Sequence, residues 1–212
     1  MASGRLMTIA AAAAFGLATA IVAAQAPAGP AQPPANPPPV AADPSLAHGQ
    51  GRGGSPIHAA RAAIKGSNGM TGTATLYEIA NGGNGHMVQI ALTVQNAPPG
   101  MHGVHIHTTG LCEGPDFKSA GGHFDPGPAG NPDPDVNHPY HMGDLPNITV
   151  GANGSGQYNV FSTRVTMGGP TGLFDADGAA IVIHQNLDPM VPGPTGSGVS
   201  GGTPIACGVI ER

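Results

Sequence analysis

Three histidines lie close together in the stretch Gly100 to His107, which reads Gly-Met-His-Gly-Val-His-Ile-His. Residues two apart on a β-strand point to the same face, so His105 and His107 are predicted to present their imidazoles side by side. Two imidazoles on one rigid face supply half of a copper or zinc site. His102 has an odd spacing from both, so a straight strand would direct it to the other face.

Further histidines follow in segments that can supply the other half. Seven of the 10 histidines fall between His102 and His184, in a chain with only 9% charged residues. A chance distribution of surface histidines explains such a set poorly, because the chain is otherwise poor in charged groups. The pattern therefore predicts a metal centre that also draws on the later segments, with the candidate ligands His123, His138, His141, Asp144 and His184.

The overall composition limits the classes of partner. The chain has 212 residues, a net charge of -5 and only 7 Lys and Arg, so no basic surface for nucleic acid is expected. Gly (35) and Pro (23) are abundant, but much of the Pro lies near the N-terminus. The remainder has about the size of one domain.

The N-terminal residues resemble a targeting segment. Arg5 precedes an uncharged apolar run that ends in Val-Ala-Ala, which predicts a signal peptide over residues 1–24 and an exported, periplasmic or secreted protein without a membrane partner in its mature form. An uncleaved membrane anchor is the alternative. Residues 25–56 are expected to be a disordered Pro/Gly-rich linker. His48 and His58 are further donors near its end, and His48 is assigned to the linker.

The rest of the chain, residues 57–212, consists of short apolar stretches separated by Gly, Asn and Pro, which is typical of strands. No amphipathic helix pattern of useful length is present. The segment 81–85, Asn-Gly-Gly-Asn-Gly, predicts a hairpin turn. An all-β domain follows, an antiparallel sandwich or barrel of about eight strands. The expected strands cover residues 57–64, 71–80, 86–94, 103–107, 148–150, 157–165 and 179–184.

The two cysteines, Cys112 and Cys207, allow one pairing. An even count in an exported chain favours a disulfide over two free buried thiols. Cys112 lies five residues after His107, so the bridge would fix the loop beside the paired histidines.

These motifs, in this order, resemble the copper/zinc superoxide dismutase family: Gly-Met-His-Gly-Val-His-Ile-His, Cys112, Gly-Gly-His-Phe-Asp-Pro, His-Met-Gly-Asp-Leu-Pro, Ile-Val-Ile-His and the closing Ala-Cys-Gly-Val-Ile. The resemblance covers about residues 57–212. It implies a Greek-key antiparallel β-barrel with long metal-binding loops. It also implies an enzyme that converts superoxide to O2 and H2O2, working as a monomer or a homodimer.

The resemblance further implies the role of each ligand. Copper would be bound by His105, His107, His123 and His184, and the four histidines would form the catalytic centre. Zinc would be bound by His123, which bridges the metals, and by His138, His141 and Asp144. Asp188 matches a carboxylate that links a copper histidine to a zinc histidine, although an ordinary loop aspartate is the alternative. His102 resembles a structural histidine of the family.

The sequence departs from the family at the channel to the copper. Family members usually carry Arg three residues before the second Cys, where this chain has Pro204. Steering of an anion depends on positive potential at the cleft, so superoxide should be attracted poorly unless Lys118 or Arg212 covers the mouth. The alternative function is therefore a copper/zinc-binding protein with weak or no dismutase activity.

The zinc loop is also spaced unusually, because His138 and His141 are only three residues apart. Asp133 or Asp135 could then serve as the first zinc ligand. His138 is preferred, since it precedes a proline and lies close in sequence to His141 and Asp144.

Overall fold

The computed structural model describes residues 56–80, 86–127, 130–169 and 171–212. The predicted signal peptide and linker lie outside this part, apart from Pro56. The strands are β1 (Pro56–Gly66), β2 (Thr71–Ala80), β3 (His86–Gln95), β4 (Gly100–His107), β5 (Asp144–Val150), β6 (Gly156–Ser162), β7 (Ala180–His184) and β8 (Pro204–Glu211). Two single 3-10 turns are η1 (Ser67–Gly69) and η2 (Lys118–Ala120).

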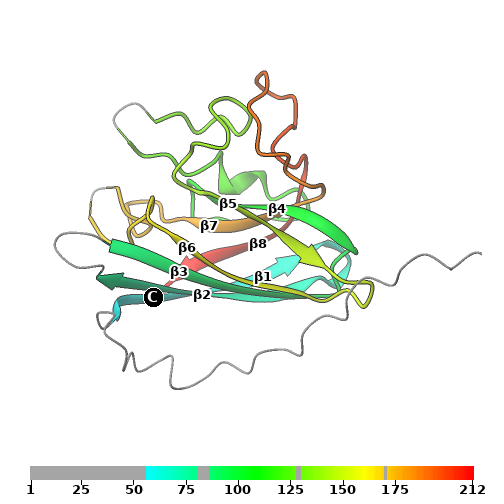
Figure 1. Cartoon of the computed structure of the whole chain (residues 1–212), viewed down its shortest axis with the longest axis horizontal. Coiled ribbons are helices and arrows are strands. Elements are labelled where there is room, and N and C mark those ends of the chain that lie inside the picture. Colours follow the sequence, from blue (N-terminus) through cyan, green and yellow to red (C-terminus); the bar gives the residue numbers. More distant parts are fainter. Residues whose placement is uncertain (1–55, 81–85, 128–129, 170) are drawn as a thin grey trace, which may run out of the picture. The chain divides into compact units, whose positions relative to one another are not determined.

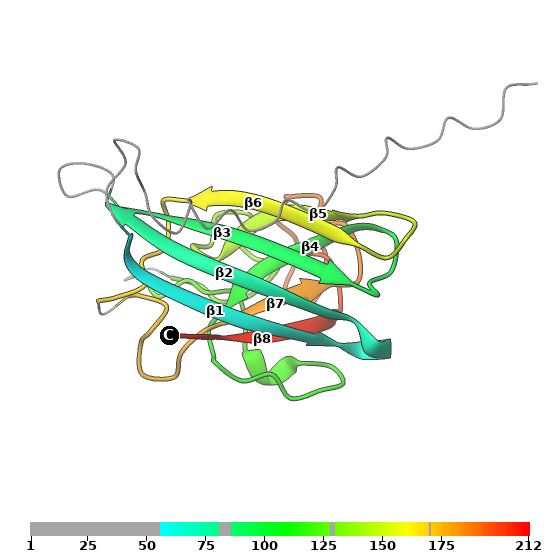
Figure 2. The same cartoon turned by 90° about the horizontal axis from the view of Figure 1, so that it is seen from below.

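The eight strands form a closed antiparallel barrel in the order β1-β2-β3-β6-β5-β4-β7-β8. The neighbours β3 and β6, and likewise β4 and β7, are distant in sequence, as in a Greek key. Figure 2 shows β1, β2 and β3 side by side along one wall. The predicted all-β barrel is confirmed.

The expected strands agree closely with the observed ones, and one was missed. β2 has the predicted bounds, and β3 pairs with it along its full length, from Thr71 opposite Gln95 to Ala80 opposite His86. The turn between them lies outside the described residues. β8 was not among the expected strands, because it begins with a proline and contains Cys207-Gly208 in place of a regular alternation. It pairs with both β7 and β1 and closes the barrel.

The core follows the two-residue period of the strands. On β3, the inward residues Val88, Ile90, Leu92 and Val94 are at most 1% exposed. β7 is instead buried on both faces. Its Ile181 and Ile183 join the core inside the barrel. Its outward side chains pack in a second cluster beneath the loop after β4, made of Phe117, Ala120, Ala180, Val182 and Cys207.

The predicted disulfide is present and ties this loop to β8. Cys112 and Cys207 are 95 residues apart in sequence, and their Cα atoms are 5.6 Å apart. Because Cys207 lies opposite Val182 on β7, the bridge holds the loop against the strand beside the paired histidines.

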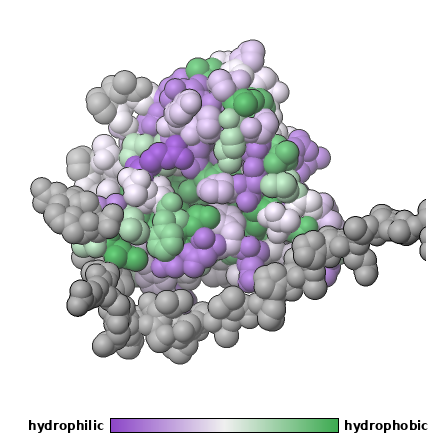
Figure 3. Space-filling view, in the orientation of Figure 1, coloured by the Kyte–Doolittle hydropathy of each residue, from purple (hydrophilic) through white to green (hydrophobic). Residues whose placement is uncertain are grey.

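The outer surface alternates between hydrophilic areas and smaller apolar areas on the face in Figure 3. None of the helices in the described ranges is long and apolar enough to span a membrane. The large exposed apolar side chains come from several elements and are Met101, Leu111, Tyr140, Phe161, Leu187 and Val191.

We expect the double substitution Cys112→Ser/Cys207→Ser to lower the free energy of unfolding by about 2–5 kcal/mol, because the bridge closes a loop of most of the domain. Denaturant titration of the oxidised protein and the variant measures this difference. Equal stability of the two proteins would contradict the expectation.

Candidate metal centre

Two neighbouring strands place the first histidines on the outside of the barrel. His105 on β4 lies opposite Val182 on β7, and His107 lies opposite Ala180. Ile106 between them points into the core and is fully buried. His107 also forms a single β-bridge with His123, which brings the loop after β4 back over the sheet. The structure therefore places His105 and His107 on one face of β4, as predicted, and this face is the outer one.

The first donor set consists of four buried imidazoles with nitrogens within 4.8 Å of one another, from His105, His107, His123 and His184. His107 Nδ1 donates to the carbonyl of Gly121 and His184 Nδ1 to that of Gly202, both at 2.8 Å. The second nitrogen of each ring then carries the lone pair. These two Nε2 atoms face each other at 3.4 Å, as two ligands of a shared ion would.

Glycines allow the backbone to come this close to the rings. Gly201 has a φ of +97°, and a Cβ there would lie 2.9 Å from the Cβ of His184. Gly121, with a φ of +78°, would clash with the Thr108 hydroxyl if it carried a side chain. Positive φ and close approach both favour glycine at these two positions.

The second donor set gathers around the carboxylate of Asp144 at the start of β5. The Nδ1 atoms of His123 and His141 lie 2.7 and 2.9 Å from it, and that of His138 lies 3.2 Å away without hydrogen-bond geometry. One group of ligand atoms within 4.8 Å of one another here comes from His105, His123, His138 and Asp144, whereas the family resemblance implied His141 in place of His105. His123 belongs to both sets.

Asp188 contacts one histidine on each side. Its carboxylate lies 2.9 Å from His105 Nε2 and 2.8 Å from His138 Nε2, and it is 1% exposed. Asn147 on β5 holds the backbone of Asp188 through two hydrogen bonds, with Nδ2 donating to its carbonyl and Oδ1 accepting from its N–H. Asp188 therefore lies between the two donor sets, where a carboxylate that orients a histidine of each set is expected.

His102 lies apart from both sets, although the reason differs from simple strand parity. A β-bulge interrupts β4 between His102 and Val104, so the strand is not straight. The ring nitrogens face two backbone carbonyls, that of His184 at 2.9 Å and that of Pro98 at 2.8 Å. His102 therefore supports the end of β7.

Asp135 is occupied by a structural role. It is 3% exposed, and its carboxylate accepts hydrogen bonds from the backbone of Gly198 and from the backbone and hydroxyl of Ser200. Its carbonyl accepts from Gly193. These bonds join the loop before β5 to the loop after β7, and both lie over the same side of the barrel in Figure 1. Asp133 is bonded to the backbone of Asp135 and Val136.

Arg164, beyond β6, braces the second donor set and was not singled out by the sequence. Its guanidinium donates to the carbonyls of Pro139 and His141 at 2.9 Å and of Asp144 at 2.8 Å. Nothing in the local sequence around Arg164 indicates this contact, because donor and acceptors are about 20 residues apart.

The pKa shifts of the histidines differ between the two sets. Burial, reinforced by the neighbouring imidazoles, lowers the pKa of His105, His107 and His123, and it lowers the pKa of His184 to about 4. Although burial also acts on His138, the nearby carboxylates of Asp144 and Asp188 raise its pKa to about 9. Burial alone would raise the pKa of Asp144 and Asp188. Hydrogen bonds from histidines outweigh it and hold both pKa values well below the usual range.

Four buried ring nitrogens have no hydrogen-bond partner among the described residues: His105 Nδ1, His123 Nε2, His138 Nδ1 and His141 Nε2. A buried polar atom without a partner is costly, and a metal ion would satisfy it. Neutral imidazoles on one side and imidazoles with a carboxylate on the other fit copper and zinc respectively.

Of the two suggested replacements for the channel arginine, Arg212 is placed elsewhere. Pro204 is paired with His184 at the start of β8. Arg212 lies at the opposite end of that strand, with its guanidinium 4.4 Å from the Phe174 ring, so covering of the mouth by Arg212 is contradicted. The charge of Lys118 is offset by Asp116 at 3.3 Å.

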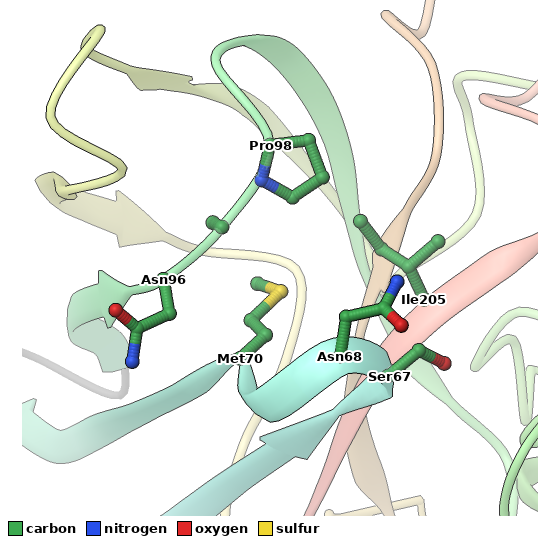
Figure 4. Close-up of a pocket in the computed structure, with 7 residues that line it drawn as sticks. Ser67, Asn68, Met70, Asn96, Pro98 and Ile205 are labelled. Carbon is green, nitrogen blue, oxygen red and sulfur yellow. The ribbon is translucent and has the colours of Figure 1, made fainter.

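A small cavity of about 270 Å3 lies away from both donor sets, between η1 and the turn from β3 to β4. Figure 4 shows Met70, Asn96 and Pro98 around it, with Ile205 from β8 on the other side. Its lining holds no charged residue. Among its lining residues, Pro98 has its carbonyl oxygen 2.8 Å from His102 Nε2.

An eight-stranded Greek-key barrel with two adjoining histidine-rich donor sets on its outer side defines a metal-binding β-barrel protein. The sequence model described as copper/zinc superoxide dismutase (SODC) matches residues 70–210. The chain belongs to the copper/zinc superoxide dismutase family, as the sequence motifs predicted.

Individual relatives agree with this assignment. The chain is 41% identical over 152 residues to a Cu-Zn superoxide dismutase of Deinococcus radiodurans, covering 67% of this chain and 78% of that protein. It is 39% identical over 132 residues to one of Caulobacter vibrioides, covering 59% and 72%. The crystal structure of a SOD-like protein from Bacillus subtilis matches with a TM-score of 0.58 and 29% identity, covering 70% of this chain and 96% of that one.

We expect the metal-free protein to lose stability as the pH falls from about 6.5 to about 4. In this window the first-set histidines accept protons in the unfolded state, with a pKa of 6.5, but not in the folded state. His138 and His141, whose pKa values are raised, are protonated in both states and add no slope. His184 alone contributes about 3 kcal/mol. Denaturant unfolding of chelator-treated protein measures the loss, and His184→Gln should flatten the dependence.

We expect Arg164→Gln to loosen residues 139–144, because three carbonyls lose a charged donor. The local opening free energy should fall by about 1–2 kcal/mol. Amide hydrogen exchange of this segment measures the change, and Arg61→Gln, on the exposed face of β1, is the matched control. Exchange at the same rate in both variants would contradict the bracing role.

Proposed function

We propose that this protein is a superoxide dismutase that converts superoxide to O2 and H2O2 at a copper site bridged to a structural zinc. The observation that carries the proposal is the position of His123. Its Nδ1 is 2.7 Å from Asp144 in the second donor set, and its Nε2, without a hydrogen-bond partner among the described residues, belongs to the side of the first.

Copper at the first set would supply a one-electron couple, so that one superoxide is oxidised to O2 and a second, with two protons, is reduced to H2O2. His105, His107 and His184 are the residues that would hold it throughout. Their other ring nitrogens are fixed by Asp188 and by two backbone carbonyls, which sets the orientation of each ring.

His123 has a different task, because it is shared between the sets. With Nδ1 held toward Asp144, its Nε2 is the atom that we assign to carry a proton to the reduced substrate. Its pKa, which burial lowers, favours transfer of that proton to the reduced substrate.

Zinc would be held by His123, His138, His141 and Asp144. Zinc is redox-inert, so its contribution would be to fix the ring of His123 relative to the first set. Since the pKa of His138 is raised to about 9, zinc binding at neutral pH should release a proton from it.

We also propose that the protein works outside the cytoplasm after removal of residues 1–24. The disulfide supports an oxidising location, because such bonds persist mainly in exported proteins. The apolar N-terminal run has the length and small residues of a signal peptide.

A second candidate is a copper/zinc-binding protein of low dismutase activity. It is favoured by Pro204, which occupies the position of the steering arginine next to His184. The similarity to a solved structure called SOD-like is compatible with it. Both candidates share the same donor sets and differ only in turnover.

An assay of superoxide consumption by the Cu- and Zn-loaded mature chain, across a range of ionic strength, separates the two candidates. We expect turnover well above that of copper bound nonspecifically to a protein, with a weak dependence on salt, because Pro204 brings no positive charge to the position of the steering arginine. Turnover no faster than nonspecific copper would leave only the metal-binding function.

We expect Pro204→Arg to raise kcat/KM for superoxide about tenfold at low salt, since a positive charge at the mouth concentrates the anion. The gain should shrink as salt is added. Pro204→Gln is the neutral control and should show no salt-dependent gain. An equal effect of Arg and Gln would mean that backbone release at this position, rather than charge, limits access.

A further inference from the structure

A second histidine–carboxylate cluster lies outside the metal centre, where β1, β2 and β3 are adjacent. Glu78 on β2 has a side chain that is only 3% exposed. His58 Nδ1 lies 2.8 Å from Glu78 Oε2, and His86 Nδ1 lies 3.4 Å from Oε1. The two imidazoles are 50% and 40% exposed, so they connect the buried carboxylate to solvent.

The strand register fixes the positions of these three residues. His58 is paired with Glu78 across β1 and β2, and His86 is paired with Ala80, two residues from Glu78. This end of β1 is level with Glu211 at the end of β8, whereas His184 is paired with Pro204 at its beginning. The cluster is therefore separate from the centre described above.

The carboxylate of Glu78 has few partners in its surroundings. Besides the two imidazoles, its carboxylate accepts one backbone hydrogen bond, from Met167 at 3.3 Å. In the described part of the chain it has no ion pair with Lys or Arg. A buried carboxylate whose only side-chain partners are two imidazoles gains from a bound cation, because the cation compensates the charge that burial removes from water.

We propose that His58, Glu78 and His86 form a peripheral binding site for Zn2+. Two imidazoles and one carboxylate are a donor set that zinc accepts, with water completing the coordination. The rings contact different oxygens of Glu78, so binding requires them to turn toward each other. Because the two rings are about half exposed, they have room to turn, while the backbone N–H of Met167 holds the Glu78 carboxylate. The proposal is independent of the dismutase function.

Histidine modification of the fully Cu- and Zn-loaded wild-type protein tests this without any substitution. Diethyl pyrocarbonate labels exposed imidazoles, and peptide mass spectrometry resolves His58, His86 and His48. With Zn2+ added at about ten times its dissociation constant, labelling of His58 and His86 should slow about tenfold, in parallel, while His48 is unaffected. Unchanged labelling of His58 and His86, or equal protection of His48, would overturn the proposal.

Zinc content after gel filtration gives the second readout. The wild-type protein should retain one zinc ion more than the double variant His58→Gln/His86→Gln, and His48→Gln should match the wild type. Should the double variant fail to fold, His86→Gln, which removes the longer contact, serves in its place. Retention of the additional ion by a folded variant would contradict the site.

Discussion

The contact of one buried carboxylate with two imidazoles determines how the rest of the metal centre is arranged. Asp188 lies within hydrogen-bond distance of His105 on one side and His138 on the other. It thereby fixes which nitrogen of each ring is available to a metal. Asn147 holds the backbone of Asp188 in turn, so the orientation of both donor sets depends on a short chain of contacts from β5 to the loop after β7.

The barrel alone cannot hold that carboxylate in place. Loops cover the centre, and they are tied down by three devices of different chemistry: the disulfide to Cys207, the carboxylate of Asp135 and the guanidinium of Arg164. Each connects a loop to a strand or to another loop far away in sequence. Together they allow the seven ionisable side chains of the two donor sets to remain buried without a large apolar cover.

The sequence predicted the parts of this arrangement that depend on local periodicity. The spacing of His105 and His107, the alternation on β3 and the order of the histidine segments are all short-range patterns, and the structure shows the fold and the proximity they suggest. The supporting contacts of Arg164, Asp135 and Asn147 were not predicted, because they join residues about 20 to 65 apart through loop geometry. Strand β8 was not predicted, because its Pro and Gly residues interrupt the alternation that marks a strand.

The two donor sets lie on different kinds of secondary structure. His105, His107 and His184 sit on hydrogen-bonded strands, whereas His138 and His141 sit in a loop before β5. Strand-borne side chains are positioned by the sheet itself, whereas the loop-borne ones depend on their contacts with Arg164, Asp144 and Asp188. The half of the centre on the strands is therefore in place once the barrel closes, and the other half is complete only once those contacts have formed.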